Sequence, residues 1–195
     1  MKLKAIIKHF MTITRHKLIV CRECIACGQI WRGLMHDNSK YSLAEFVPSA
    51  MHFQGTRSPI EAEKEETGYS AAWLHHKGHN KHHWEYWTDF DDAGGIIANK
   101  IPYEYVVEMV CDWIGAGMVY SKEKWTPAAT LDYYDKVRAS RRFHPVTEGL
   151  IIGFLVTLRH EGLKGFHREA KSNELQSFYR ATGSKTIVPA ERSKT

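Results

Sequence analysis

The sequence predicts an all-α fold, and three observations support this prediction. Apolar residues recur at helical spacing over long stretches, as they do from Ile6 to Leu34. Alternating apolar and polar runs, which are typical of strands, are few. Helix-start signals recur along the chain, such as Pro102 before a long apolar segment and Ser42 three residues before Glu45. We therefore expect seven or eight helices, without a substantial sheet.

The elements are expected in the following order. Lys4–Leu34 is mostly helical, as one helix or as two with a break before Arg15, and a turn follows at Asp37–Ser39. A helix starts at Ser42, and Pro48 kinks or ends it. The later expectations are a loop at 54–59, a short helical turn at 61–66, a helix at 70–77 interrupted by Gly78 and resumed near Asn80, a loop at 89–95, a helix at 103–118, a loop at 121–126, and helices at 128–138 and 145–159.

One domain is expected over residues 1–183, followed by a polar, basic tail at 184–195. A chain of 195 residues is long enough to bury a core without disulfides. The formal net charge of +5 is compatible with anionic substrates, nucleic acid or an acidic surface, and also with an ordinary solvated basic face. No basic-aromatic motif of a nucleic-acid module is present, so nucleic-acid binding is not predicted. No signal peptide and no apolar run of membrane-spanning length is found, which predicts a cytoplasmic protein; the oligomeric state is left open.

Three of the four cysteines, Cys21, Cys24 and Cys27, recur every third residue, and the fourth is Cys111. The spacing is shared with part of an iron–sulfur ligand run. The same spacing within one helix favours ordinary buried thiols, because a continuous helix wraps poorly around one cluster. A redox-sensitive pair is the third alternative.

Histidines are the most informative feature for function. The chain has 12 of them, and five fall within the nine positions from His75 to His83. Trp73, Trp84, Tyr86, Trp87 and Phe90 surround this stretch, and they either pack in the core or wall a pocket around the histidines. Neutral imidazoles and carboxylates in such number are suited to bind zinc or other transition metals.

The candidate ligands lie far apart in the sequence and must come from different helices. In chain order they are His16, His36-Asp37, His75 or His76, His82-His83 and Asp112. Helices of a bundle commonly build metal sites from inward-facing side chains. A carboxylate next to a histidine is able to bridge two metals, which would bind phosphate and generate a hydroxide nucleophile.

The order His, His-Asp, His, His-His, Asp resembles the HD-domain metal-dependent phosphohydrolases. His36-Asp37-Asn38-Ser39-Lys40 is similar to their His-Asp-x-x-Lys signature, and His82-His83 is similar to the paired histidines of two-metal members. The resemblance implies an HD-domain-like helical bundle. No Gly-Tyr-Pro follows the paired histidines, so hydrolysis of cyclic dinucleotides is not implied.

The chain more closely resembles a group of bacterial and phage proteins without a settled activity. The shared motifs are His16-Lys17, His36–Lys40, Asn80–Trp84 and Asp112-Trp113, within residues 10–160. This second resemblance supports the same site but implies no substrate.

Carried over to this chain, the HD-domain resemblance implies two metal positions. His16, His36, Asp37 and Asp112 would hold the first metal, Asp37 would bridge, and His76, His82 and His83 would be available to the second. Lys40 would contact an anionic group of the substrate. Asp37 and Lys40 are therefore the expected catalytic residues, and one or two divalent transition metals (Fe, Mn, Zn, Co or Ni) are the expected cofactors.

Several residue roles stay open. One of His82 and His83 would bind substrate or cap a helix instead of binding metal. His75 and His79 are alternatives to His76 as a metal ligand. Glu108 shares a helix face with Asp112 and would either orient a ligand histidine or pair with a lysine. Arg141 and Arg142 are expected on a charged face rather than in an anion site.

Three functions follow from these observations. The leading hypothesis is a metal-dependent hydrolase acting on a phosphate ester, either a nucleotide or another small phosphorylated metabolite. The second is a di-iron oxygenase on the same scaffold, because mixed histidine and carboxylate ligands suit iron. The third is a noncatalytic binding or regulatory protein whose metal is structural.

Overall fold

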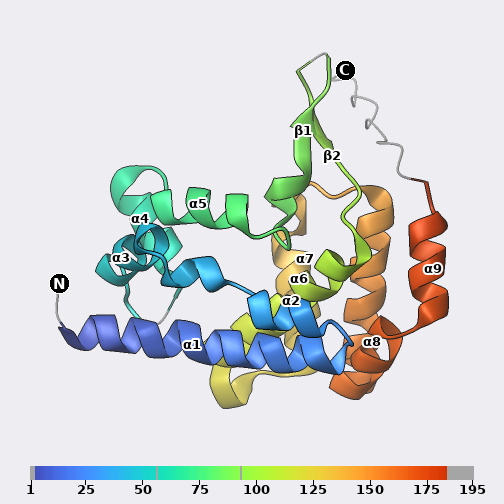
Figure 1. Ribbon diagram of the computed structural model, residues 1–195, viewed down its shortest axis with the longest axis horizontal. Helices are drawn as coiled ribbons and strands as arrows, with labels where there is room; N and C mark the ends of the chain where they lie inside the picture. The colour runs from blue at the N-terminus through green and yellow to red at the C-terminus, as the bar shows by residue number, and fades with distance from the viewer. Residues whose placement is uncertain (1–2, 56, 93, 184–195) are drawn as a thin grey trace.

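The computed structural model describes residues 3–55, 57–92 and 94–183, and it is built almost entirely of helices (Figure 1). Within the described residues the elements are α1 (Leu3–Ala26), α2 (Ile30–Met35), η1 (Asn38–Tyr41), α3 (Leu43–Met51), α4 (Pro59–Thr67), α5 (Ala71–His79), η2 (Trp84–Trp87), β1 (Thr88–Phe90), β2 (Ile96–Ala98), α6 (Tyr103–Ser121), η3 (Lys122–Lys124), α7 (Pro127–Val137), η4 (Arg138–Ser140), α8 (Pro145–Ala170) and α9 (Asn173–Ala181). The predicted all-α fold class is confirmed. The expected tail at 184–195 lies outside the described residues.

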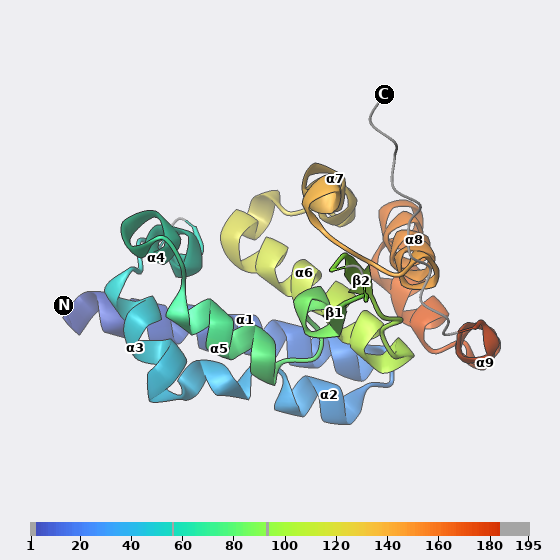
Figure 2. The ribbon, with the colours of Figure 1, turned by 90° about the horizontal axis from the view of Figure 1, so that it is seen from above.

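Helix α1 is a long helix at one side of the molecule, and several of the other helices pack against it. It packs extensively against α6 and α2, while α3 packs against α5 and α7 against α8. Figures 1 and 2 both place α3, α4 and α5 over the N-terminal half of α1, and α8 and α9 at the opposite end of the molecule. The strands β1 and β2 form an antiparallel hairpin that projects away from the helices (Figure 1).

The hydrophobic core lies where α1, α6 and α8 meet. Val110 and Ile114 of α6 pack with Phe154 and Leu158 of α8, and each of these side chains is fully buried. Val20 carries the core onto α1. None of the described helices is long and apolar enough to span a membrane.

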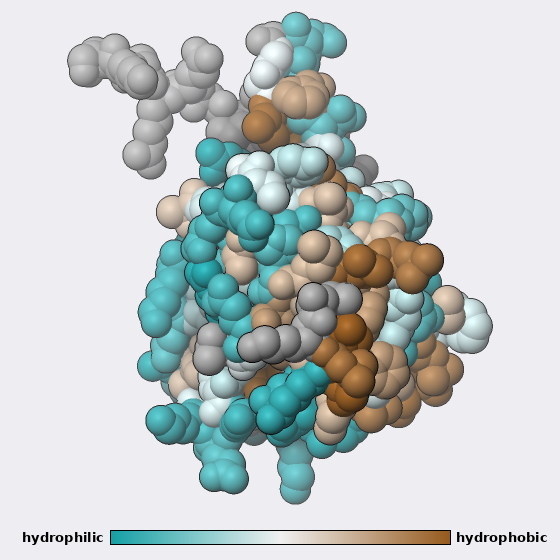
Figure 3. All heavy atoms as spheres, turned by 90° about the vertical axis from the view of Figure 1, so that its left-hand side faces the viewer, coloured by the Kyte–Doolittle hydropathy of each residue, from teal (hydrophilic) through white to brown (hydrophobic). Residues whose placement is uncertain are grey.

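The end of the molecule formed by α1, α3 and α4 is largely hydrophilic, with a cluster of hydrophobic residues along one side (Figure 3). Exposed apolar side chains of α1 and α3 include Met11 at 63% and Leu43 at 82% of their free exposure. The apolar periodicity of α1 is therefore only partly explained by packing in the core.

The first helix corrects one expectation from the sequence. It is continuous through Arg15, and the break falls at residues 27–29 instead. The physical reason is Gly28, which has a left-handed φ of 77° that favours glycine. The polar run Arg15-His16-Lys17 does not interrupt the helix, because His16 and Lys17 turn toward partners on neighbouring segments.

Two more helices differ from expectation. Helix α5 continues through Gly78 to His79, since one glycine inside a helix costs only about 1 kcal/mol. The expected second helical segment near Asn80 is instead the short 3-10 helix η2. Helix α8 extends beyond Arg159 to Ala170, with a non-helical residue at Gly162.

A hairpin and a helix were not expected at all. The hairpin flanks the predicted loop at 89–95, and its three-residue strands are too short to leave an alternating pattern. The other missed element is α9, capped by Ser172, whose hydroxyl accepts from the amide of Leu175. Helix α3 does start after Ser42, and Pro48 lies inside it, but the Ser42 side chain makes no capping hydrogen bond.

Candidate metal centre

The residues proposed as ligands from the sequence meet at one buried point. His16 comes from α1, His36 and Asp37 from the link between α2 and η1, His76 from α5, His82 and His83 from the link between α5 and η2, and Asp112 from α6. Their ligand atoms form two groups that share Asp37, and within each group these atoms lie within 4.8 Å of one another. The structure thus brings together all seven residues.

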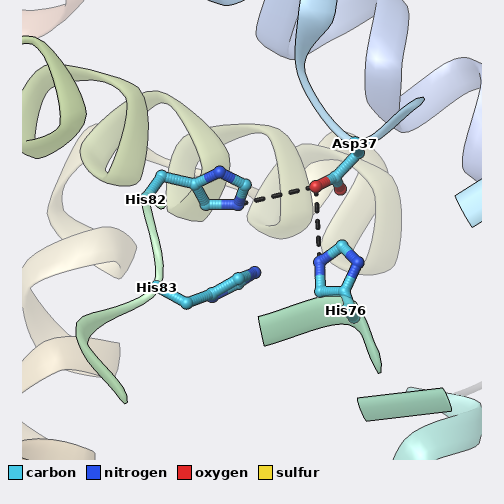
Figure 4. A group of neighbouring side chains, drawn as sticks. All are labelled: Asp37, His76, His82 and His83. Atoms are coloured by element: carbon cyan, nitrogen blue, oxygen red, sulfur yellow. Dashed lines mark ion pairs between the residues drawn. The ribbon is translucent and has the colours of Figure 1, made fainter. Parts of the chain in front are cut away.

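Asp37 lies at the centre, and its two carboxylate oxygens face different groups. Oδ2 lies 3.5 Å from Nε2 of His16 and 3.3 Å from Nε2 of His36. Oδ1 lies 3.3 Å from Nε2 of His76 and 3.5 Å from Nε2 of His82 (Figure 4). The backbone of Asp37 has a φ of 54°, which is uncommon for a residue other than glycine and is typical of constrained functional positions.

The first group contains His16, His36, Asp37 and Asp112. Oδ1 of Asp112 lies 2.9 Å from Nε2 of His16 and 3.5 Å from Nε2 of His36, and the two imidazole Nε2 atoms are 3.4 Å apart. Two ligands about 2.1 Å from one metal at a tetrahedral angle are separated by roughly 3.4 Å. Most of these separations fit that spacing, and the contact between His16 and Asp112 is shorter.

The second group contains Asp37, His76, His82 and His83. Figure 4 shows the His76 and His82 rings approaching the same carboxylate oxygen of Asp37, with the His83 ring directed toward the space between the two rings. The Nε2 atoms of His82 and His83 are buried without a hydrogen-bond partner. Buried polar atoms are rarely left unpaired, so these two nitrogens fit a role as ligands.

Two buried carboxylates orient three of the imidazoles. Glu108 of α6 accepts hydrogen bonds from Nδ1 of His36 at 3.0 Å and from Nδ1 of His82 at 3.2 Å. Glu45 of α3 accepts from Nδ1 of His76 at 2.7 Å. In a neutral imidazole that donates from Nδ1, the lone pair is on Nε2, which here faces the centre and would be available to a metal. Glu108 could also join His36 and His82 in holding a metal ion, but its distances to both are those of hydrogen bonds.

The sequence left the role of Glu108 open and gave Glu45 no role in the metal centre. Glu108 touches one imidazole of each metal group, so it couples the two groups. Glu45 was interpreted as part of a capping box with Ser42, but its side chain bonds to His75 and His76 instead. A short motif such as Ser-x-x-Glu does not distinguish a cap from a distant partner.

Two further residues support the backbone of the centre. Nζ of Lys17 donates to the carbonyls of Leu34 and His36 and to Oδ1 of Asn38, which ties α1 to the segment that carries Asp37. Gly115 lets α1 approach α6, because a Cβ there would lie 2.5 Å from Cγ2 of Val20. The motif His16-Lys17 pointed to the lysine, but nothing in the sequence indicated Gly115.

The electrostatics of the centre favour cations. Burial alone would raise the pKa of Asp37, but the charges of His36 and Lys40 hold it well below its ordinary value. Burial also opposes ionisation of Asp112, and hydrogen bonds from His16 and His36 lower its pKa well below normal. Both carboxylates are therefore ionised at neutral pH inside a buried site, where a bound positive charge is strongly attracted.

Lys40 is the expected anion-binding residue, and Nζ lies 2.5 Å from Oδ2 of Asp37. Burial would lower the Lys40 pKa, but the charges of Asp37 and Asp112 outweigh burial and raise it. The ammonium group is therefore charged. Its side chain keeps 27% of its exposure and lines the cavity described next.

A cavity of about 530 Å³ opens directly onto the centre. Its wall includes five of the seven candidate ligands, namely His16, His76, His82, His83 and Asp112. Trp73 and Trp84 also line it, while Trp87 packs against the core and Phe90 is exposed. The aromatic residues near the histidines thus divide between the two expected roles. Arg141 lines the cavity as well, which corrects its expected place on a charged face.

The remaining singled-out residues lie away from the cluster. His75 bonds to Glu45, and His79 stacks on His75 at 4.0 Å, so neither joins a metal group of the described residues. Cys24, Cys27 and Cys111 are buried in the core, with Sγ of Cys27 4.0 Å from Sγ of Cys111. None of the potential metal sites among the described residues includes a cysteine.

The chain matches the model of a known protein family. Residues 5–156 match a family described as a family of unknown function, DUF5662, and the chain belongs to that family. The match covers every residue of both metal groups. No curated protein and no solved structure matches the chain, so the all-α architecture stands on the structure itself, and the resemblance to HD-domain proteins stays a prediction.

Proposed function

We propose that the protein is a metal-dependent hydrolase of a phosphate ester, either a nucleotide or another small phosphorylated metabolite. The observation that carries the proposal is the placement of Asp37. Its two oxygens face two separate sets of imidazole Nε2 atoms, and the shared centre opens onto a cavity large enough for a small metabolite. A carboxylate between two metal positions is the arrangement expected of a two-metal phosphohydrolase.

The donor set fits divalent transition metals. Imidazole nitrogen and carboxylate oxygen bind Fe, Mn, Zn, Co and Ni, and the site lacks the all-oxygen composition that suits Mg²⁺ or Ca²⁺. A metal held by His16, His36, Asp37 and Asp112, with a second at His76, His82 and His83, would activate water and offset the charge that develops on phosphate.

The protein's own residues would supply the rest of the catalysis. Lys40 keeps a positive charge at the cavity wall and would attract and orient an anionic phosphate group. Asp37 would hold the two ligand sets at a fixed separation, since Glu108 and Glu45 orient imidazoles on both sides of it. The resemblance to HD-domain phosphohydrolases supports the same roles for Asp37 and Lys40.

The test combines elemental analysis with a phosphatase screen. The protein is purified without a polyhistidine tag, and metal content is measured for the wild type and for His36→Ala, Asp37→Asn and His82→Ala. His160→Ala is the matched control, because His160 is exposed on α8 and lies outside both metal groups. Each preparation is then reconstituted with Mn²⁺, Fe²⁺, Co²⁺, Ni²⁺ or Zn²⁺ and assayed with a panel of nucleotides and sugar phosphates.

We expect one or two equivalents of metal in the wild type and in His160→Ala, and loss of metal and phosphatase activity in the three cluster variants. Absence of metal after reconstitution would overturn the proposal. Two bound irons with oxygen consumption and no phosphatase activity would replace it with the oxygenase. Metal without any turnover or oxygen consumption would favour a noncatalytic binding or regulatory protein.

A further inference from the structure

Helix α1 carries apolar side chains on two sides. One side packs against the rest of the protein and includes the buried residues Ile13 and Val20. On the side away from them, Met11, Leu18 and Ile25 recur every seven residues, which is close to two helical turns, so they lie along one stripe. All three side chains are exposed. The described part of the fold therefore leaves a second apolar stripe of α1 uncovered.

The exposed apolar surface continues from α1 onto its neighbours. The Phe10 ring of α1 lies 5.9 Å from the Tyr41 ring of η1, and both rings are exposed. Trp31 of α2 and Leu43 and Met51 of α3 are exposed as well. We refer to these exposed apolar side chains of α1, α2, η1 and α3 as the apolar face, and Figure 3 shows hydrophobic side chains gathered along one side of this end of the molecule. Their exposed fractions amount to on the order of 1,000 Å², whereas the largest apolar patch on a typical monomer covers about 300–600 Å². A surface of this size marks an interaction site.

The apolar face has a basic border. Lys4, Lys8 and Arg15 are exposed, and they lie seven, three and four residues from Met11, which places them on the same side of α1. The acidic residues of positions 3–55 are all buried, with partners inside the protein: Glu23, Asp37 and Glu45. The described surface of α1, α2 and α3 therefore presents cations beside apolar side chains and no exposed carboxylate.

We propose that the apolar face binds the surface of a lipid bilayer that contains anionic headgroups. Helix α1 lies along the bilayer surface, with its exposed apolar stripe between the headgroups and the first part of the acyl chains. Lys8 and Arg15 extend from the border of the stripe to the lipid phosphates, which attract them. Trp31 lies at the level of the headgroups, where indole rings are favoured. The proposal is independent of the metal centre and of the hydrolase proposed for it.

Two other occupants fit the apolar face less well. A second copy of this chain would bring the basic borders of two α1 helices together without an exposed carboxylate to offset them, and like charges across an interface are unfavourable. A helix of another protein typically binds in a groove. Here the apolar side chains project instead, since Leu18 and Trp31 keep 66% and 65% of their free exposure. A bilayer accepts projecting apolar side chains and supplies anions around them.

The experiment is co-sedimentation of the full chain with vesicles, either of phosphatidylcholine alone or of phosphatidylcholine with about one-third phosphatidylglycerol, at low and high salt. The variants of the apolar face are the double variant Lys8→Glu/Arg15→Glu and the single variant Leu18→Ser. Their matched controls replace exposed residues of α7, α8 and α9 in the same way: Lys136→Glu/Lys164→Glu and Phe178→Ser. Thermal unfolding verifies that each variant is folded, and the double variant carries the test if Leu18→Ser is not.

We expect the wild type and both controls to bind the vesicles with phosphatidylglycerol at least tenfold more tightly than those of phosphatidylcholine alone, and high salt to weaken this binding. Lys8→Glu/Arg15→Glu and Leu18→Ser should each weaken it tenfold or more. A second measurement locates the contact, because lipids with brominated acyl chains quench tryptophans that reach them. Such lipids should quench the fluorescence of the wild type, and most of this quenching should be lost in Trp31→Phe, which still binds.

Three results would overturn the proposal. The first is a wild type that does not bind the vesicles with phosphatidylglycerol. In that case sedimentation velocity identifies the alternative, since a dimer that Leu18→Ser dissociates would assign the apolar face to a second copy of the chain, and a monomer would assign it to another protein. The second is equally tight binding by the wild type and the folded variants of the apolar face. The third is quenching that is unchanged in Trp31→Phe, because a different surface would then contact the lipid.

Discussion

Substitution of Glu108 tests directly whether the candidate ligands form two metal-binding groups. Its carboxylate accepts from Nδ1 of His36, which belongs to the first group, and from Nδ1 of His82, which belongs to the second. Burial would raise the Glu108 pKa, but the two histidines lower it to about 2, so the carboxylate is ionised at neutral pH. Replacing Glu108 with alanine should therefore weaken both metal positions at once.

The size of the effect follows from the two hydrogen bonds. Removing a partner that orients a metal-bound histidine typically costs about 10–100-fold in metal affinity. Because Glu108 serves one histidine in each group, we expect a loss of about this size at each position. Glu108→Gln keeps an acceptor of the same shape and should lose less. Glu45→Ala is the informative contrast, since among the candidate ligands Glu45 contacts only His76 of the second group.

The assay is calorimetric titration of metal-free protein with Mn²⁺ or Zn²⁺ in competition with a chelator, fitted to two binding steps. Glu108→Ala should weaken both steps and Glu45→Ala only one. Glu63→Gln is the control, because Glu63 is a buried carboxylate that accepts from Ser70 and the Ala71 amide, away from the centre. If Glu108→Ala changed one step only, or Glu45→Ala changed both, the assignment of the histidines to two groups would be refuted.

Three further predictions concern packing, pH and the substrate. Gly115→Ala should destabilise the fold by about 1–3 kcal/mol, measured by thermal unfolding, and should reduce bound metal, because the new Cβ would lie 2.5 Å from Cγ2 of Val20. Gly149→Ala is the control, since a Cβ there meets open space, and it should be neutral or stabilising in the same assay. Burial and the charge of Lys40 lower the pKa of His9 to about 4, so the unfolded state takes up the proton first and stability falls as pH drops from 6.5 to 4. At pH 5 this loss of unfolding free energy is about 2 kcal/mol. The variant His9→Phe should not show the loss when its unfolding by denaturant is measured at pH 7 and pH 5. The same dependence of unfolding free energy on pH in the variant and the wild type would contradict the reasoning. Lys40→Gln should lower the turnover of a phosphate ester by about 100-fold while metal content stays near that of the wild type, and equal turnover would remove Lys40 from the proposed mechanism.

The candidate ligands could be selected from the sequence because histidine and aspartate are the residue types that commonly bind transition metals. Histidines and aspartates at wide spacing, such as His16 and Asp37, have few reasons to be buried together other than metal or proton chemistry. The all-α class was predictable for a similar reason, since helical periodicity is long enough in α1 and α6 to be unmistakable. Where the signal was short, as in the strands of the hairpin, the prediction was wrong.

The supporting residues could not be predicted, because their roles depend on distant partners. Glu45 lies 31 positions from His76, and Glu108 lies 72 positions from His36. In the sequence each is an ordinary glutamate with a plausible local role in a cap or a surface pair.

The balance of charge in the centre favours positive charge beside the carboxylates. Asp37, Glu45 and Glu108 are buried carboxylates, and Asp112 lies beside them with a side chain 14% exposed. Among the residues that the structure describes, Lys40 is the lysine that forms an ion pair with a carboxylate of the two groups, and a neutral histidine offsets no charge. Buried carboxylates must therefore be neutralised by protons on the imidazoles or by metal ions. Protonated imidazoles have partners for this, because Nε2 of His16 lies 2.9 Å from Oδ1 of Asp112 and Nε2 of His36 lies 3.3 Å from Oδ2 of Asp37. A metal ion would take the place of these protons at the same nitrogens, so metal binding should release protons and weaken as pH falls.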